Sequence, residues 1–300
     1  MKIVIRTSGI RLLFILGSAG LLLAACSVNP GGANRPLTQE AATSLTGVAS
    51  LSNDYLVAML GNPTGVAPLT LANGDGLPAP VANLAKTAGL EPQATSQCVI
   101  KSGSSDDADG DGLPLDATFS FDCTEMDQGN EAHFEATIHI QDKNDNDPDS
   151  GYRVEVPNFE WSETSAGETS KVTLHEIFDL TVASASYSVQ YELEVNASSP
   201  TESGGLSENA TATYTPDDPA DPFAAGELVT DGQTTFTSDG KSYSLSEMTT
   251  PSLHYAAACS SDFDEGSAQY VDSESNTLTI VYHGCDDVTI TYNGFPLAAN

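Results

Sequence analysis

The sequence predicts a mainly β protein with an antiparallel sheet and a short N-terminal helical segment. Two observations support this class. Apolar and polar residues alternate along several runs after residue 98, and turns rich in Gly, Asp, Asn and Pro separate these runs. One apolar and one polar face per strand is typical of antiparallel sheets with one side exposed to water. The pattern leaves a sandwich, an open barrel and a curved meander as alternatives.

The first 25 residues have the features of an export signal. Three basic residues flank or precede an apolar run over residues 12–25, which is shorter than the ~20 residues needed to span a bilayer. The run ends in Leu-Ala-Ala-Cys26, and this leader resembles the lipobox of bacterial lipoproteins. The resemblance implies cleavage before Cys26 and a lipid on its sulfur, and Ser27 favours the outer membrane. The alternative is an ordinary secretory signal with an incidental cysteine.

The chain is strongly acidic, which restricts its partners. It has 42 acidic and 10 basic residues, with a formal net charge of −32. Nucleic acid and anionic lipid surfaces are poor partners for such a charge. We therefore expect no nucleic-acid partner. The expected partners are the membrane, through the lipid anchor, a divalent cation, and an unknown protein or envelope partner. Adaptation to a salty habitat would explain the same composition.

Two segments precede the predicted sheet. Residues 26–40 form a polar tether with Gly and Pro, and residues 41–97 form a helical and irregular segment. Within it, Leu45, Val48 and Leu51 begin an apolar stripe of helical period that ends near Gly61. This stripe either packs on the sheet or forms a lid over a lipid. The β-rich domain then occupies residues 98–300.

The strands of that domain are predicted from their alternation. The clearest runs cover residues 117–122, 131–141, 172–182, 187–195, 278–282 and 288–292. In the third run Glu176 interrupts the apolar face. About ten strands are expected in all.

Cysteine usage also indicates export. Four cysteines remain besides Cys26, and an oxidising compartment favours their pairing. Three connectivities are open, and closeness in sequence favours Cys98–Cys123 and Cys259–Cys285. Zinc is the competing interpretation, but the chain has no C-x-x-C spacing and no clustered histidines.

The strongest candidate site is an Asp-rich loop between Cys98 and Cys123. Asp107, Asp109 and Asp111 occupy the first, third and fifth positions of a calcium loop, Leu113 offers its carbonyl at the seventh, and Asp116 follows. The stretch D-A-D-G-D-G-L-P-L-D resembles the calcium repeats of thrombospondin type 3 and similar bacterial surface proteins. The resemblance implies that calcium is the ion. The alternative is a solvated acidic turn.

A second acidic loop repeats the spacing with Asp145, Asp147 and Asp149. It joins two strand-like runs, so it is expected at the end of a hairpin. This loop is a second candidate metal loop, or else a simple polar turn.

No catalytic motif is present. The chain lacks a G-x-S-x-G elbow, an H-E-x-x-H pair and a phosphate-binding glycine loop. As a whole it resembles β-rich bacterial lipoproteins. We therefore expect a non-enzymatic envelope lipoprotein with a calcium-stabilised β domain that scaffolds or binds a partner. A lipid-carrier or lipoprotein-sorting module and a polysaccharide hydrolase are the alternatives.

Overall fold

The computed structural model describes residues 35–46 and 99–297, apart from short internal gaps. These gaps are residues 105, 111–112, 128–129, 148–149, 166, 184–185, 201–202, 239, 260–261 and 286. The predicted leader, the lipidation site Cys26, most of segment 41–97 and Cys98 lie outside the described residues. In the part of the chain that is described, no helix is both long and apolar enough to cross a membrane.

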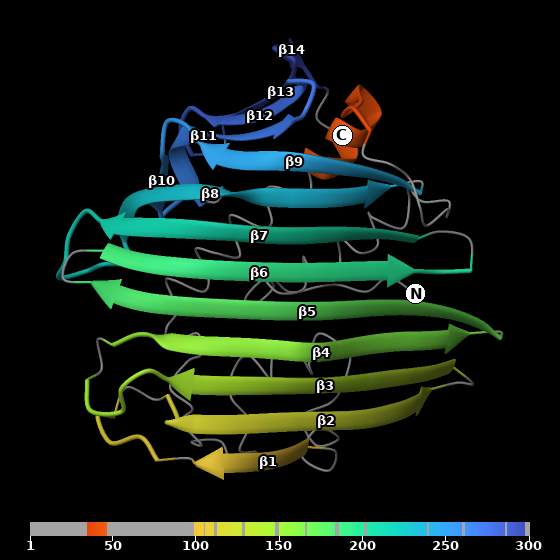
Figure 1. The fold of residues 1–300 in the computed structure, drawn as a ribbon, viewed down its shortest axis with the longest axis vertical. Helices are drawn as coiled ribbons and strands as arrows, with labels where there is room; N and C mark the ends of the chain where they lie inside the picture. The colour runs from red at the N-terminus through yellow and green to blue at the C-terminus, as the bar shows by residue number, and fades with distance from the viewer. Residues whose placement is uncertain are drawn as a thin grey trace.

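The described residues fold into one antiparallel sheet of fourteen strands (Figure 1), which confirms the predicted fold class. Among the predicted alternatives the curved meander is correct, because the first eight strands follow one another across the sheet in sequence order. The first eight strands are β1 (Val99–Ser104), β2 (Asp116–Asp127), β3 (Asn130–Asp142), β4 (Tyr152–Ser165), β5 (Glu168–Ala183), β6 (Ser186–Ser198), β7 (Ser203–Pro216) and β8 (Ala225–Ser238). The last six are β9 (Lys241–Thr249), β10 (Leu253–Ala256), β11 (Phe263–Asp272), β12 (Thr277–Tyr282), β13 (Val288–Tyr292) and β14 (Phe295–Pro296).

Beyond β8 the order changes, because β9 and β10 together occupy the position between β8 and β11. Each of these two short strands pairs with both β8 and β11. Between the end of β9 and the start of β10, the Ser267 N–H donates to the Pro251 carbonyl at 3.2 Å. Opposite this junction Gly266 has a φ of +105°, and a Cβ there would lie 2.0 Å from the Ser252 carbonyl oxygen. The junction therefore needs glycine at this position.

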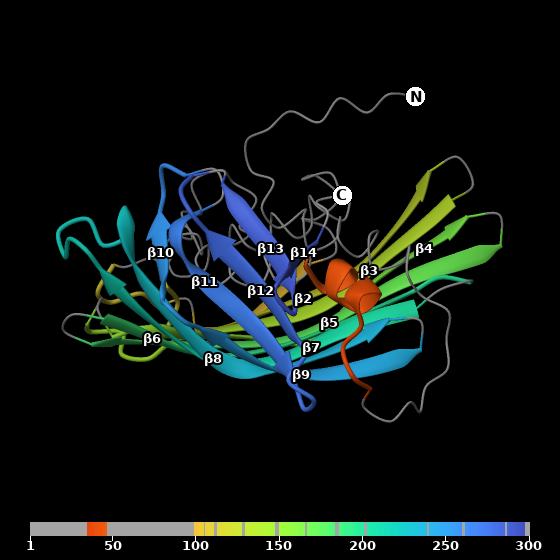
Figure 2. The same cartoon turned by 90° about the horizontal axis from the view of Figure 1, so that it is seen from above.

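The sheet is curved, with the helix and strands β10 to β13 on its concave side (Figure 2). Side chains alternate between buried and exposed along the strands, as β6 and β7 show over nearly their whole length. The buried set forms one apolar core. Its largest members are Phe119, Phe134, Tyr152, Phe178, Tyr191, Tyr214, Phe236, Phe263 and Tyr270. Burial of this apolar face is the main favourable contribution to folding.

The helix covers residues 39–46 and packs its apolar side on the core. Its first turn is capped by Thr38, whose side-chain oxygen accepts the Ala41 N–H at 3.2 Å. Ala41, Ala42 and Leu45 are buried, as is Leu37 just before the helix. The beginning of the predicted helix is confirmed, and its continuation toward Gly61 lies outside the described residues.

Glu247 is a buried carboxyl group of β9, where it lies opposite Gly232 of β8 and Tyr270 of β11. Glu247 of β9 is 1% exposed and accepts hydrogen bonds from the Thr234 hydroxyl at 3.0 Å and the Tyr270 hydroxyl at 3.2 Å. Burial raises the pKa of Glu247 to about 7, and the charge of Asp231 adds to this, although the two hydrogen bonds oppose it. Glu247 therefore ionises near neutral pH.

Replacing Glu247 with glutamine (Glu247→Gln) is expected to stabilise the protein by about 2 kcal/mol at pH 8 and by little at pH 5. The folded-state pKa lies above the ordinary value of 4.5. The stability contributed by this group is therefore complete below pH 4.5 and is lost as the pH rises through about 7. Denaturant unfolding at both pH values measures the difference. Glu265→Gln, which changes an exposed residue of β11, is the control, and an equal gain at both pH values would contradict this assignment.

Candidate metal centre

Two acidic loops that are far apart in the sequence lie side by side at one end of the sheet. In an antiparallel meander the β1–β2 and β3–β4 connections emerge at the same end, and pairing of β2 with β3 brings them together. Contacts between the loops fix their positions. The Ala108 N–H donates to Asp145 Oδ1 at 2.8 Å, and the Asp142 N–H donates to the Pro114 carbonyl at 3.2 Å.

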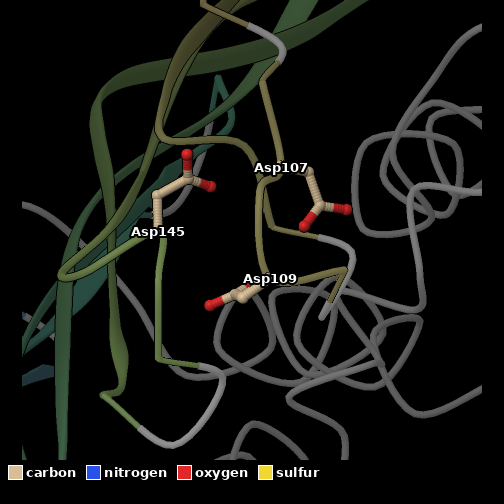
Figure 3. Close-up of side chains that lie close together, drawn as sticks. All are labelled: Asp107, Asp109 and Asp145. Atoms are coloured by element: carbon tan, nitrogen blue, oxygen red, sulfur yellow. The ribbon is translucent and has the colours of Figure 1, made fainter.

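Asp107 and Asp109 of the first loop meet Asp145 of the second (Figure 3). One carboxylate oxygen from each residue lies within 4.8 Å of the other two. Two ligands on opposite sides of a calcium ion are separated by about 4.8 Å, because each lies roughly 2.4 Å from the ion. The spacing of the three oxygens is therefore compatible with one shared divalent cation. We call these three residues the Asp triad.

Local hydrogen bonds hold the carboxylates in this arrangement. The Gly110 N–H donates to Asp107 Oδ1 at 2.8 Å, which closes a turn directly after the first ligand. Gly110 has a φ of +79°, a conformation that glycine adopts without strain. Without a cation, each pair of carboxylates at this separation repels by about 1 kcal/mol even with water-like screening. A bound divalent cation would replace this repulsion with attraction.

The predicted ligands divide into three groups. Asp107, Asp109 and Asp145 come together, so the two loops predicted as separate candidates contribute to one cluster. Asp111 and Asp149 lie outside the described residues. The remaining predicted ligands, Leu113, Asp116 and Asp147, are not part of the Asp triad.

Two of those remaining residues have further contacts in the structure, and the Leu113 carbonyl stays a predicted ligand. The side chain of Leu113 is 4% exposed and belongs to the apolar core. Asp116 opens β2 and lies 2.9 Å from His139 Nε2 on the neighbouring strand β3. The calcium-repeat resemblance implies ligands from one loop, whereas the Asp triad draws on two, because pairing of β2 with β3 brings Asp145 beside Asp107 and Asp109.

Asp142 supports the second loop and was not predicted as a functional residue. It is 3% exposed, and its Oδ1 accepts the Asn144 N–H at 3.2 Å and the Ser150 hydroxyl at 3.1 Å. The two bonds fix the loop that carries Asp145. A signal was present in the sequence, because Asp142 continues the inward alternation of Phe134, Ala136, Ile138 and Ile140 along β3.

Two basic residues near the second loop, Lys143 and Arg153, pair with a carboxylate outside it, that of Asp179. The Lys143 ammonium contacts Asp179 and donates to the Thr181 hydroxyl at 2.6 Å. Arg153 donates to Asp179 at 3.2 Å from the adjacent strand. Lys143 is therefore engaged with β5 although it lies only two residues before Asp145.

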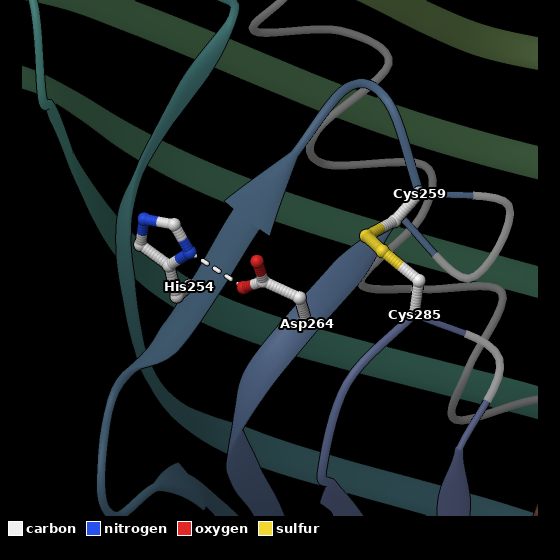
Figure 4. Close-up of a disulfide and its surroundings, with 4 residues drawn as sticks. All are labelled: His254, Cys259, Asp264 and Cys285. Atoms are coloured by element: carbon white, nitrogen blue, oxygen red, sulfur yellow. Dashed lines mark hydrogen bonds and ion pairs between the residues drawn. A yellow bond between two sulfur atoms is a disulfide. The ribbon is translucent and has the colours of Figure 1, made fainter.

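A second group of charged residues lies beside the disulfide (Figure 4). His254 of β10 places Nδ1 2.6 Å from Asp264 and Nε2 3.0 Å from Asp217. Burial would lower its pKa, but hydrogen bonds and charge from the two carboxylates raise the pKa of His254 to about 9. Both ring nitrogens are occupied by carboxylates, so neither is left to activate a nucleophile. His254 therefore joins the β7–β8 connection to β10 and β11 as an imidazolium.

The predicted Cys259–Cys285 disulfide is present, with Cα atoms 5.0 Å apart. It links the β10–β11 turn to the β12–β13 turn. Cys123 is buried in β2, whereas Cys98 lies outside the described residues, so the Cys98–Cys123 pairing stays a prediction.

Comparison with known proteins adds no relative: no family model, no curated protein and no solved structure matches this chain.

Proposed function

We propose that this chain is a lipid-anchored envelope protein whose β domain is stabilised by calcium and that it scaffolds or binds an envelope partner without catalysis. The observation that carries the calcium part is the Asp triad, which gathers three hard oxygen ligands from two loops. Calcium binds six to eight oxygens, so backbone carbonyls or water would complete the shell. The ion would join the β1–β2 and β3–β4 connections and stabilise the folded form by mass action.

Membrane attachment in this proposal depends on the leader and Cys26. Two or three acyl chains at that cysteine would anchor the protein stably, whereas one chain binds only marginally. The outer membrane is the proposed location, because serine rather than aspartate follows Cys26. The arrangement of His254 is consistent with a non-enzymatic role, since both of its ring nitrogens serve structural ion pairs.

Two measurements test the two parts of the proposal separately. Titration calorimetry with calcium and magnesium tests the ion. We expect calcium to bind more tightly, because three carboxylates from two loops suit its flexible coordination better than the octahedral geometry that magnesium requires. Mass spectrometry of the N-terminal peptide tests the lipid, with Cys26→Ala as the unmodified control. Absence of calcium binding would remove the first part, and an unacylated Cys26 would remove the second.

The lipid-carrier alternative has one observation in its favour. The sheet is curved, and the helix whose buried residues belong to the apolar core lies on its concave side (Figure 2). A carrier would copurify with lipid. Extraction of the protein purified from its native membrane, followed by lipid analysis, distinguishes a stoichiometric lipid from the trace amounts expected of the scaffold.

A further inference from the structure

The segment that follows the predicted tether is docked at one corner of the sheet. The Leu37 N–H donates to Asp272 Oδ2 at 2.6 Å, and the Tyr292 hydroxyl donates to the Leu37 carbonyl at 2.5 Å. Two residues earlier, the Arg35 N–H donates to the Ser242 carbonyl at 3.1 Å. Leu37 itself is 1% exposed. The chain is thus attached to β9, β11 and β13 before the helix begins.

Asp272 holds this dock together. It is 7% exposed and also accepts the Glu274 N–H, the Asn276 N–H and the Asn276 side-chain amide, each at 2.8 Å. These bonds shape the β11–β12 turn around the same carboxylate that binds Leu37. We call the β8–β9 connection, the β11–β12 turn and residues 35–37 the docking corner.

The docking corner and the Asp triad lie at opposite corners of the sheet. Turns alternate between the two ends of an antiparallel meander, so the β3–β4 turn and the β11–β12 turn emerge at opposite ends. Between β4 and β11 lie β5 to β9, which separates them by roughly 30 Å across the sheet at ~4.8 Å per strand. Figure 1 shows the two corners on opposite sides of the molecule.

Chain length then limits how far the docking corner can move from a lipid on Cys26. Nine peptide steps separate Cys26 from Arg35, so the maximum reach is about 30 Å, and a flexible chain of that length averages roughly 15–18 Å. Arg35 and Lys241, two of the ten basic residues of the chain, lie at this corner and largely offset the charges of its acidic residues Asp239 (by sequence in the β8–β9 connection), Asp272 and Glu274. An anionic bilayer surface therefore meets less repulsion here than over the acidic loops.

We infer that the docking corner faces the membrane and that the Asp triad is held at the far corner, away from the bilayer surface. This inference rests on the proposed lipid anchor at Cys26. Docking by Leu37, rather than the tether itself, determines which side of the domain is turned to the membrane. The calcium-binding corner is then exposed to partners and to the ions of the surrounding medium.

Energy transfer from protein to membrane tests the orientation in the full lipidated protein. A donor dye is attached to Ser273→Cys at the docking corner or to Asn146→Cys beside the Asp triad, both of which are exposed positions. The protein is bound to phosphatidylcholine vesicles that carry an acceptor dye on the headgroup. We expect several-fold higher transfer from position 273 than from position 146. Equal transfer, or higher transfer from position 146, would overturn the inference.

Two controls separate this inference from the lipid anchor. Cys26→Ala is expected not to bind vesicles. If the wild-type chain also fails to bind them, the anchoring proposal is wrong, and the proposed orientation is wrong as well. If the protein binds but the two positions give equal transfer, only the orientation is wrong. Inserting ten Gly and Ser residues ahead of Arg35 should reduce the difference between the positions while leaving binding intact, because the lengthened tether no longer limits the corner.

Discussion

Replacing both cysteines of the Cys259–Cys285 disulfide with alanine is expected to lower the free energy of unfolding by about 3 kcal/mol. The two residues are separated by 26 positions in the sequence, and the loop they close contains β11 and β12. Without the disulfide, the unfolded chain gains the conformational entropy of the open loop, which favours the unfolded state. A protein of this size should lose roughly 6–12 °C in melting temperature.

The position of the disulfide localises the effect. It ties the β10–β11 turn to the β12–β13 turn, and Cys259 is buried while Cys285 is exposed. We therefore expect amide hydrogen exchange to increase first in β12 and β13, which lie near the edge of the sheet. His283→Ala, in the same β12–β13 turn, is the control. A loss below about 1 kcal/mol in the double alanine variant would contradict the expected constraint.

Replacing Asp272 with alanine is expected to destabilise the protein by about 3 kcal/mol. The change removes the acceptor for three backbone N–H groups, those of Leu37, Glu274 and Asn276. A charged acceptor makes each bond stronger than a neutral pair, and the abandoned Leu37 N–H lies in a buried position. Thermal unfolding measures the loss, and increased exchange of the Leu37 amide distinguishes undocking from general destabilisation.

The protonation of Asp272 gives this prediction a pH dependence. Burial alone would raise its pKa, but hydrogen bonds from the Asn276 side chain and from the backbone of Leu37 and Asn276 keep the pKa of Asp272 below its ordinary value. Its contribution to stability is therefore present at neutral pH and is lost as the pH falls through the lowered pKa. Glu274→Ala changes an exposed acid in the same turn and should have little effect. An equally large loss in that control would contradict a specific role for Asp272.

Much of the sheet was predictable because alternation survives wherever the inward residues are large and apolar. This is true of β3, where Phe134, Ala136, Ile138 and Ile140 point into the core. β7 is not among the clearest alternating runs, because Glu208, Ala210 and Ala212 occupy its central inward positions. Small and charged residues give no contrast with the polar face, so tertiary pairing alone establishes this strand.

The sequence predicts the kind of ligand in the candidate site, but not which loops supply the ligands. The spacing of Asp107 and Asp109 indicates an oxygen-rich loop, and this much follows from the sequence. The participation of Asp145 depends on β2 pairing with β3, which alternation does not specify. Likewise, Asp116 matches a loop ligand by spacing, but in the structure it begins β2 and pairs with His139 across the strands.

The central claim is that one metal ion joins the two acidic loops, and melting of the mature chain with and without calcium tests it most directly. We expect calcium to raise the melting temperature, with a stabilisation of about 2.7 kcal/mol when its concentration is a hundred times the dissociation constant. Asp145→Asn keeps an acceptor for the Ala108 N–H but removes a ligand charge, so it should abolish most of the rise. Asp147→Asn, in the same loop but outside the Asp triad, should retain it. No rise in the wild-type protein, or an equal loss in both variants, would contradict a site shared by the two loops.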